Sequence, residues 1–533
     1  MKKLEFALLI ALCFLVYANS LNNAFVSDDI PEILENPSIS HPQRLLTRPP
    51  EELLNSLCFL LGRYNPFIYH LLNTILHSLD TLLVFIFLGL FFNPAASLMG
   101  ACLFAVHPVH AEAVSWISGK PYLLLTLAVL GTYLLYNKSL SRQGTPVKPN
   151  IFLYILTLLI FSYSLLKAPA FYFLTPFFLI LTDIALKKWR ERLKFWLPFL
   201  FILGLRIVLI KYVILQRQFY LTDVQGGGLL SINPLVKFIL VVSNHLWLLL
   251  WPFKLTIFHE PVEYAPWQIS IGVVCFVLLV LTMPLIFKKS RAVFLSIVIF
   301  ILFLFPVYSP IPLASNLVAE HYIYLPSISL SILAAFLYQK RKIPLLLFVL
   351  LISLLGWQTF LRNQDWSTPE KFWNATVKVS YKSPSAYNAL GLMYKEKGDF
   401  DNALIALKKA ITLKPDFTFA YNNLGNLYSD MGRRDEAIAY YKKALSLNTR
   451  DLDAYYNLGI TYAEMGKEND SIAYFRKAVE INPRDAGAWV NLGVVYVSIG
   501  RKEEARESFR QAIRVEPDNP AAYFNLKKLE SGQ

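Results

Sequence analysis

The sequence is poor in cysteine and in charged residues for its length. It has only four cysteines among 533 residues, and Asp, Glu, Lys and Arg together make up 17% of the chain. The four cysteines are scattered along the chain and have neither disulfide nor metal-ligand spacing. This pattern excludes a disulfide scaffold and a cysteine-based metal centre.

Familiar catalytic loops are also missing. The sequence has no glycine-rich phosphate loop of the Walker or Rossmann kind, and no Ser-His-Asp or Cys-His hydrolase signature. His107, His110 and Glu112 are zinc-ligand types, but their spacing matches no known metal motif. Pro108 also breaks the helix that would align them. We therefore predict no metal site, and the sequence leaves open whether a divalent cation assists.

Long apolar runs dominate the first two thirds of the chain. Hydrophobic residues make up 55% of the sequence, which is typical of a membrane protein. Runs near the length of roughly 20 residues that spans a bilayer recur throughout this part. They lie near 4–20, 70–92, 95–116, 119–137, 150–166, 169–186, 195–215, 267–287, 292–312, 325–339 and 343–361. A further run at 234–252 is ambiguous.

The basic residues indicate the orientation of these runs. The first 362 residues hold 27 Lys and Arg against 15 Asp and Glu, whereas the remainder holds 24 and 22. A basic excess in the membrane part is typical of cytoplasmic loops and argues against a nucleic-acid surface. If all five basic clusters face the cytoplasm, the run at 234–252 does not cross fully, about 11 spans result, and the C-terminus lies outside. The clusters lie near 2–3, 138–148, 187–194, 288–291 and 340–342.

An acidic pair follows the first apolar run directly. Asp28 and Asp29 stand where the first helix should meet the outer water layer. Carboxylates near hydrocarbon are costly and therefore indicate a functional site. The alternative is a solvated loop that needs polar residues where a helix leaves the membrane. The predicted topology also places 107–112, 216–234 and 319–322 on this outer face, as expected for an active site built between helices.

The C-terminal part is a repeat array. Gly391, Gly425, Gly459 and Gly493 recur at about 34 residues, which is the tetratricopeptide period. Tyrosine, alanine and a second glycine keep the same spacing in each unit. We predict an all-α protein with a membrane-embedded bundle over 1–362, a linker over 363–382, and an α-solenoid of four repeats plus a cap over 383–533.

Asparagine recurs two residues before the repeat glycine. The positions are Asn423, Asn457, Asn491 and, by its equivalent place, Asn525. Side-chain amides can both donate to and accept from a peptide backbone, so such a ladder could hold an extended polypeptide. It resembles the asparagine ladder inside the O-GlcNAc transferase superhelix. The alternative is that asparagine is simply common at this position of the repeat.

Several stretches share their residues and their order with one known family. They are Phe25-Val-Ser-Asp28-Asp29 with Asn36-Pro37, Arg48-Pro49, Asn65-Pro66 with His70-Leu-Leu-Asn73 and His77, Leu103-Phe-Ala-Val-His107-Pro-Val-His110-Ala-Glu112, Ala319-Glu320-His321-Tyr322-Ile-Tyr324-Leu-Pro-Ser327, and Arg362-Asn363-Gln-Asp365-Trp366. On these motifs the chain resembles the transmembrane-and-tetratricopeptide-repeat O-mannosyltransferases of the GT-C class. It departs from the family at Lys120 and His321, where arginine is usual.

The resemblance implies an inverting membrane glycosyltransferase. It would move a mannose-like sugar from a polyprenyl-phosphate carrier to a hydroxyl, such as Ser or Thr of a protein, on the non-cytoplasmic side. Asp28 or Asp29 would be the general base. Cations or donors would bind the carrier phosphate, and the candidates are Arg48, His107, His110, Lys120 and His321. The residues implied to orient them are Glu112, Glu320, His70, Asn73 and Tyr324.

Two other functions fit the sequence. A non-catalytic membrane scaffold could assemble envelope complexes through the repeats, and a polymerase or ligase for lipid-linked polysaccharide could also join membrane spans to such repeats. The expected partners are membrane lipid, a polyprenyl-phosphate-linked sugar and a protein bound by the repeats. The Lys-Lys start and short loops favour a bacterial inner membrane over the endoplasmic reticulum, with the repeats on the periplasmic or luminal side.

Overall fold

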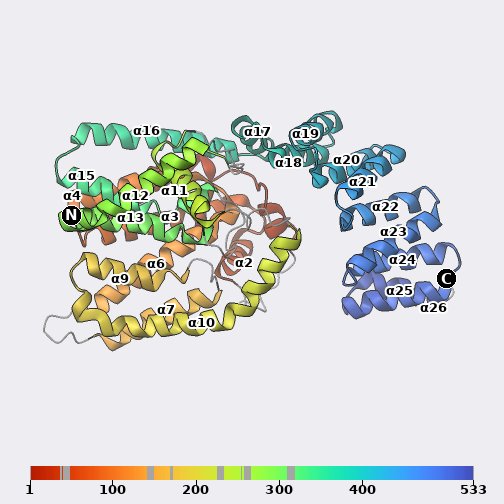
Figure 1. The fold of residues 1–533 in the computed structure, drawn as a ribbon, viewed down its shortest axis with the longest axis horizontal. Helices are drawn as coiled ribbons and strands as arrows, with labels where there is room; N and C mark the ends of the chain where they lie inside the picture. The colour runs from red at the N-terminus through yellow and green to blue at the C-terminus, as the bar shows by residue number, and fades with distance from the viewer. Residues whose placement is uncertain are drawn as a thin grey trace. The chain divides into compact units, whose positions relative to one another are not determined.

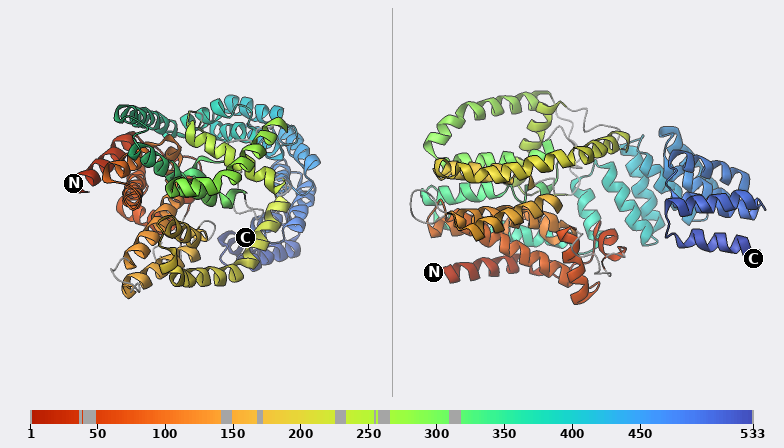
Figure 2. Two further views of the ribbon diagram at one scale, coloured as in Figure 1. Left: turned by 60° about the vertical axis from the view of Figure 1, so that its left-hand side comes forward. Right: turned by 90° about the horizontal axis from the view of Figure 1, so that it is seen from below.

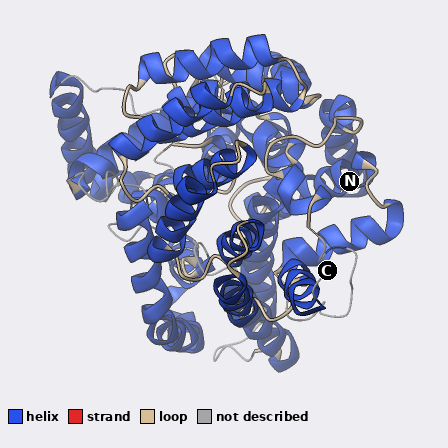
Figure 3. Cartoon of the chain, turned by 90° about the vertical axis from the view of Figure 1, so that its right-hand side faces the viewer, coloured by secondary structure: helices blue, strands red, loops and turns tan. Residues whose placement is uncertain are grey.

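The computed structural model describes residues 2–36, 39, 49–140, 149–167, 172–224, 233–253, 255–256, 266–308 and 318–531. All regular elements in these ranges are helices (Figure 3), which confirms the predicted all-α class. The chain forms two compact units, Met1–Val379 and Ser380–Gln533 (Figure 1). Residues 363–382, predicted as a linker, include a short helix η8 (Gln364–Trp366) and α17 (Pro369–Val379), both within the first unit.

The first unit is a bundle of mostly apolar helices. Its helices are α1 (Lys2–Tyr17), α2 (Pro50–Gly62), α3 (Pro66–Leu88), α4 (Pro94–Val106), α5 (Ala111–Ser115), α6 (Lys120–Ser139), α7 (Ile151–Lys167), α9 (Thr175–Ala185), α10 (Trp189–Val224), α11 (Pro234–Leu250), α12 (Pro266–Lys289), α13 (Arg291–Phe303), α14 (Phe305–Tyr308), α15 (Ile328–Gln339), α16 (Leu345–Asn363) and α17. Residues 216–224 were predicted as a loop, but α10 continues through them because the segment holds neither glycine nor proline.

Asparagine-proline pairs begin several of these helices. Asn65 accepts a hydrogen bond from the Phe67 N–H at the start of α3, and Asn93 accepts one from the Ala96 N–H at the start of α4. The amide oxygen satisfies an N–H that has no partner inside the helix. The proline that follows is preset for the first helical position and has no N–H to satisfy. These pairs therefore fix where α3 and α4 begin.

Four helices in the described residues are long and apolar enough to cross a membrane. They are Lys3–Ser20, Pro66–Leu88, Ile117–Ser139 and Leu345–Trp366, and the bent pair Pro94–Val106 with Pro108–Ser115 would make a fifth. Shorter apolar helices accompany them, among them α7, α9, α11, α13 and α15. The chain is thus a membrane protein by the length and composition of its helices. The predicted total of about 11 spans stays a prediction.

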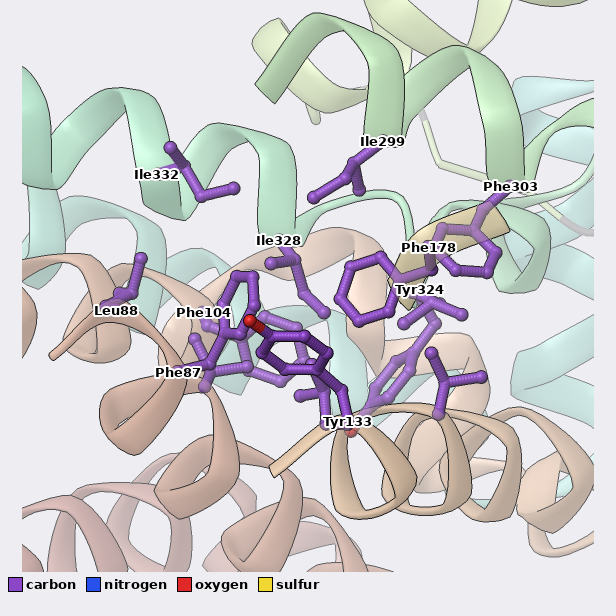
Figure 4. Close-up of a cluster of buried hydrophobic side chains, with 14 of the residues drawn as sticks. Phe87, Leu88, Phe104, Tyr133, Phe178, Ile299, Phe303, Tyr324, Ile328 and Ile332 are labelled. Atoms are coloured by element: carbon purple, nitrogen blue, oxygen red, sulfur yellow. The ribbon is translucent and has the colours of Figure 1, made fainter. Parts of the chain in front are cut away.

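The bundle is held by an apolar core shared among α3, α4, α6, α9, α13 and α15. Phe87, Phe104, Phe178 and Phe303 are almost completely buried there (Figure 4). α4 and α15 approach closely at Gly100, where an added Cβ would lie 2.6 Å from the Ser331 carbonyl oxygen. The absence of a side chain at Gly100 therefore permits this contact.

The second unit is built of stacked helix pairs (Figure 2). Its helices are α18 (Pro384–Glu396), α19 (Phe400–Leu413), α20 (Thr418–Asp430), α21 (Arg434–Leu447), α22 (Leu452–Glu464), α23 (Glu468–Ile481), α24 (Ala486–Ser498), α25 (Lys502–Val515) and α26 (Pro520–Ser531). Gly459 on α22 lies against Phe475 on α23, and an added Cβ would be 2.7 Å from the Phe475 ring. The periodic glycine thus serves packing between the two helices of a repeat.

Candidate active site

The acidic pair has two different environments. Asp29 is fully buried, whereas Asp28 is exposed. Asp29 accepts hydrogen bonds from the Val26 N–H at 3.1 Å and from both the N–H and the hydroxyl of Ser118 at 2.8 Å. Asp29 therefore anchors the loop, and its neighbour is left facing outward. The carboxylate that is free to meet a second molecule is that of Asp28.

Burial and hydrogen bonding act in opposite directions on Asp29. Burial raises the pKa of Asp29 to about 6, and the hydrogen bonds from Val26 and Ser118 limit the rise because they favour the charged form. Asp29 is therefore mostly ionised at neutral pH. Its three hydrogen bonds hold the short helix η2 (Ile30–Leu34) that it begins.

The backbone before the pair is strained. Ser27 has a φ of 53°, in the left-handed region that residues with a Cβ seldom adopt. The Asp29 hydrogen bond to Val26 closes the turn that contains Ser27. Strain of this kind costs of order 1–3 kcal/mol and concentrates at functional sites. The turn directs Asp28 outward, since Asp29 occupies the inward position.

Lys120 lies on the inner side of this loop. It is 1% exposed, donates to the Ile117 carbonyl oxygen at 2.8 Å, and sits 5.5 Å from the centre of the Tyr69 ring. It lies near enough to Asp29 for their charges to interact. Lys120 thus places a buried basic side chain close to the buried carboxylate of Asp29, two residues after Ser118 in the chain.

His321 is held by Glu112. The Glu112 carboxylate accepts from the His321 N–H at 2.9 Å and from Nδ1 at 2.8 Å, so both the backbone and the ring of His321 are fixed. The Tyr122 ring stacks on the imidazole at 4.4 Å. Glu112 therefore fixes the orientation of His321, and its part in catalysis stays a prediction. His321 also lines a small pocket with Tyr122, Leu125, Phe303, Tyr322, Leu325 and Pro326.

Arg362 pairs with two acidic side chains close to His321 in the chain or in the same motif. Its guanidinium lies 3.5 Å from Glu320 and 2.8 Å from Asp365, and its side chain is 10% exposed. Glu320 directly precedes His321, so the two glutamates of the predicted site each pair with a different basic side chain. The sequence motif contained Arg362, but nothing in its spacing indicated that it would pair with Glu320.

An aromatic cluster joins the acidic loop to these residues. Val26, Trp366 and Phe372 are buried together, with Trp116 packed against them. The Trp116 and Trp366 rings stack at 6.4 Å, and Trp116 lies 6.0 Å from the His321 ring. The structure therefore brings together the first loop, the 107–122 segment, the 319–324 segment and the end of α16. Such convergence was predicted for the loop, 107–112 and 319–322.

The other predicted polar residues lie inside the bundle. His107 Nε2 lies 2.9 Å from the Leu249 carbonyl oxygen, and His110 Nδ1 lies 2.8 Å from that of Phe104. His70 Nε2 lies 3.1 Å from the Asn23 carbonyl oxygen, which ties α3 to the acidic loop.

Two further predicted residues bear on this interior. Asn73 donates to the Trp116 carbonyl oxygen at 2.9 Å, which orients the start of the 116–122 segment. Tyr324 is buried beside His110, and their rings are 4.6 Å apart. Arg48 falls outside the described residues. The direct phosphate-binding roles of His107, His110, Lys120 and His321 stay predictions. Within the described ranges, no three His, Cys, Asp or Glu side chains are grouped so as to hold a metal ion.

The repeat asparagines form bonds between units. Asn423 donates to Asn388 at 2.9 Å and Asn457 donates to Asn426 at 3.0 Å, in each case reaching the preceding repeat. Asn491 donates to the Tyr456 hydroxyl at 2.8 Å, whereas Asn525 bonds within its own helix. All four are half-buried. They follow the array in register, and peptide binding by them is untested.

Comparisons with known proteins agree with both parts of the chain. The Tetratricopeptide repeat model matches residues 417–484 and 452–516, and the TPR repeat model matches 391–432. The crystal structure of MamA protein matches 28% of this chain and 81% of its own at 28% identity, with a TM-score of 0.26, which is too low to support an argument.

Curated relatives match a much longer stretch. Protein O-mannosyl-transferase TMTC3 of Homo sapiens is 25% identical over 77% of this chain and 52% of its own length. Protein O-mannosyl-transferase F38B6.6 of Caenorhabditis elegans is 26% identical over 77% of this chain and 63% of its own. The chain thus spans about half the length of the human relative that it matches. In agreement with its motifs, the chain is therefore similar to proteins named as O-mannosyl-transferases over most of its length.

Proposed function

We propose that the protein is a membrane O-mannosyltransferase of the inverting GT-C type. It transfers a mannose-like hexose from a polyprenyl-phosphate carrier to a Ser or Thr hydroxyl of a protein, on the side of the membrane opposite the cytoplasm. The observation that carries this proposal is that the two adjacent aspartates have different environments. Asp29 accepts three hydrogen bonds and is buried, whereas Asp28 is exposed and lies two residues after Val26, which belongs to the cluster with Trp116 and Trp366. The relatives named as O-mannosyl-transferases support the reaction class.

Asp28 acts as the general base in this proposal. The acceptor hydroxyl oxygen bonds to the anomeric carbon as its proton passes to the Asp28 carboxylate. The bond from that carbon to the carrier phosphate oxygen breaks, and its electron pair leaves with the phosphate. Attack opposite the leaving group inverts the configuration in one step. A base in contact with the hydroxyl contributes typically 10²–10⁴-fold to such a reaction.

The developing phosphate charge requires fixed cations or donors. His321 and Arg362 are held in place by Glu112, Glu320 and Asp365. Lys120 and, from the sequence motif alone, Arg48 complete the set proposed for this role. Because carboxylates fix the His321 and Arg362 side chains, little reorganisation is needed when the carrier binds. His107 and His110 already contact carbonyl oxygens, which favours an indirect role that shapes the same segment.

The repeat unit recruits the protein acceptor in this proposal. Tetratricopeptide arrays use extended surfaces for binding, and the asparagines at each repeat could bond to a polypeptide backbone.

The test is transfer by the purified full-length protein in lipid nanodiscs. Defined polyprenyl-phosphate hexoses serve as donors, and a total envelope protein extract serves as acceptor. We expect base-labile hexose on Ser or Thr of protein, with mannose preferred over glucose. Transfer to lipid-linked polysaccharide alone would instead support the polymerase or ligase function. No transfer from any donor, with the protein folded, would support a scaffold.

A further inference from the structure

A hydrogen-bonded chain of three side chains crosses the interior of the first unit. Asp80 and His77 lie on α3, and Tyr324 follows the short helix η7 (Glu320–Ile323). The Tyr324 hydroxyl is 3.1 Å from Asp80 Oδ2 and 2.7 Å from His77 Nδ1. All three are 0% exposed, and Tyr324 lies within the apolar core (Figure 4). The mechanism above uses neither Asp80 nor His77.

The hydrogens available to this chain restrict its protonation. His77 Nε2 lies 3.0 Å from the Ala105 carbonyl oxygen, which can only accept, so Nε2 carries a hydrogen. Tyr324 has one hydroxyl hydrogen and two neighbours. If that hydrogen goes to His77 Nδ1, Asp80 must be protonated and donate to the Tyr324 oxygen. If it goes to Asp80, His77 must be doubly protonated. Either way, the chain holds one proton more than an ionised Asp80 beside a neutral His77.

The surroundings of Asp80 favour the first arrangement. Its Oδ1 has no hydrogen-bond partner in the described part of the chain. Helix α3 is also one of those long and apolar enough to span a membrane. An ionised carboxylate needs several donors or a cation, and burying one without them costs several kcal/mol.

Asp183 shows the contrasting case in the same protein. It is equally buried, but it pairs with Arg192 at 2.9 Å and accepts from Tyr136 and Trp196. Asp183 thus has the cation and the donors that a carboxylate needs, whereas Oδ1 of Asp80 has no such partner in the described residues.

We propose that Asp80 is protonated and that the neutral chain Asp80–Tyr324–His77 is a clasp that positions residues 319–327. A second bond supports it, because Ser327 Oγ lies 2.8 Å from His110 Nε2. The clasp secures the C-terminal side of this segment, while Glu112 holds His321 within it. Asp80 and His77 are thus positioning residues. The role of His321 in transfer rests on the proposed function, but the protonation of Asp80 and the ordering of the segment do not.

The first test is infrared spectroscopy of the full-length protein at mildly alkaline pH. We expect a carboxylic acid C=O band that disappears in Asp80→Asn and persists in Asp183→Asn. Tyr324→Phe should move the band to higher frequency, because the acid O–H loses its acceptor. If Asp80→Asn and Tyr324→Phe both leave the spectrum unchanged in this region, Asp80 is ionised and the inference is wrong.

The second test is hydrogen exchange measured by mass spectrometry on the same full-length variants. Asp80→Leu should raise exchange several-fold in peptides covering 318–327, and the repeats over 384–531 should be unaffected. Asp80→Asn should stay close to wild type, because its amide N–H can donate to Tyr324 as the acid does. Unchanged exchange in Asp80→Leu, or an equal rise throughout the first unit, would contradict a positioning role. Neither experiment depends on whether the protein transfers mannose.

Discussion

Ser118 donates both its backbone N–H and its hydroxyl to the same oxygen of Asp29, each at 2.8 Å. This pair joins the first loop to the short helix η6 (Ile117–Gly119), 89 residues further along the chain. Lys120 follows immediately, so one short stretch fixes the loop and supplies a buried cation. The position of Asp28 is thus set by a contact between two distant parts of the sequence.

Removing the Ser118 hydroxyl should weaken this anchor. A hydrogen bond to a charged group contributes about 1.5–3 kcal/mol. We expect Ser118→Ala to reduce mannosyl transfer by about tenfold or more while the protein still inserts into membranes, since about 1.4 kcal/mol corresponds to a factor of 10. Ser118→Thr keeps the hydroxyl and serves as the matched control. Equal activity of the alanine and threonine variants would show that the hydroxyl does not position the loop.

The raised pKa of Asp29 predicts the direction in which stability changes with pH. The folded pKa of about 6 lies above the ordinary aspartate pKa of 3.8, so the folded protein binds this proton more tightly than the unfolded one. Stability contributed by Asp29 is complete below about pH 4 and falls as pH rises to about 6, by about 3 kcal/mol at 1.36 kcal/mol per unit. The melting temperature of Asp29→Asn minus that of wild type should therefore increase between these values. A difference that is flat with pH would contradict the assignment.

Much of the fold and part of the site could be predicted from the sequence. The regular spacing of Gly391, Gly425 and the later repeat glycines predicted the repeats. Each of these glycines is needed for close packing between the two helices of its own repeat. The polar stretches that meet near His321 were also predicted, because basic clusters determine which loops share a face. Such patterns can be recognised in a sequence because they depend on the local geometry of a repeat and on the orientation of helices in the membrane.

Contacts between distant residues could not be predicted in the same way. Ser118 and Arg362 belong to no periodic pattern, and their partners Asp29 and Glu320 lie far away in the chain. Asp80 could not be predicted as part of a site, because a single acid in an apolar run forms no motif with a recognisable spacing. Its bond to Tyr324 appears only when α3 and the segment after η7 pack together.

A methyl group at a repeat glycine should disturb packing. The Cβ of Gly459→Ala would lie 2.7 Å from the Phe475 ring, and overpacking of this kind costs typically 1–3 kcal/mol. We expect a lower denaturation midpoint of the second unit by circular dichroism or tryptophan fluorescence. The double variant Gly459→Ala with Phe475→Leu should recover part of the loss. If the single variant is as stable as wild type, the helices of this repeat can separate more freely than the packing implies.

The repeat asparagines should contribute more to the binding of acceptor protein than to the stability of the repeats. Replacing Asn423, Asn457, Asn491 and Asn525 by alanine removes three bonds between repeats, each worth about 0.5–1.5 kcal/mol. We expect a modestly lower midpoint and clearly weaker crosslinking to acceptor protein. Asn469→Ala, an exposed asparagine on α23, is the control. Crosslinking as strong as wild type would mean that the amides serve only to hold the repeats together.

The central claim is that Asp28 is the base and Asp29 its anchor. The most direct measurement is the rate of mannose transfer from a defined mannosyl-phosphoryl-polyprenol by Asp28→Asn, with Glu35→Gln as a control for an exposed acid in the same loop. We expect Asp28→Asn to lower the rate by about two orders of magnitude or more. Glu35→Gln should keep it, and insertion and melting temperature should be normal in both variants. An Asp28→Asn variant that transfers mannose at the wild-type rate would show that Asp28 is not the base.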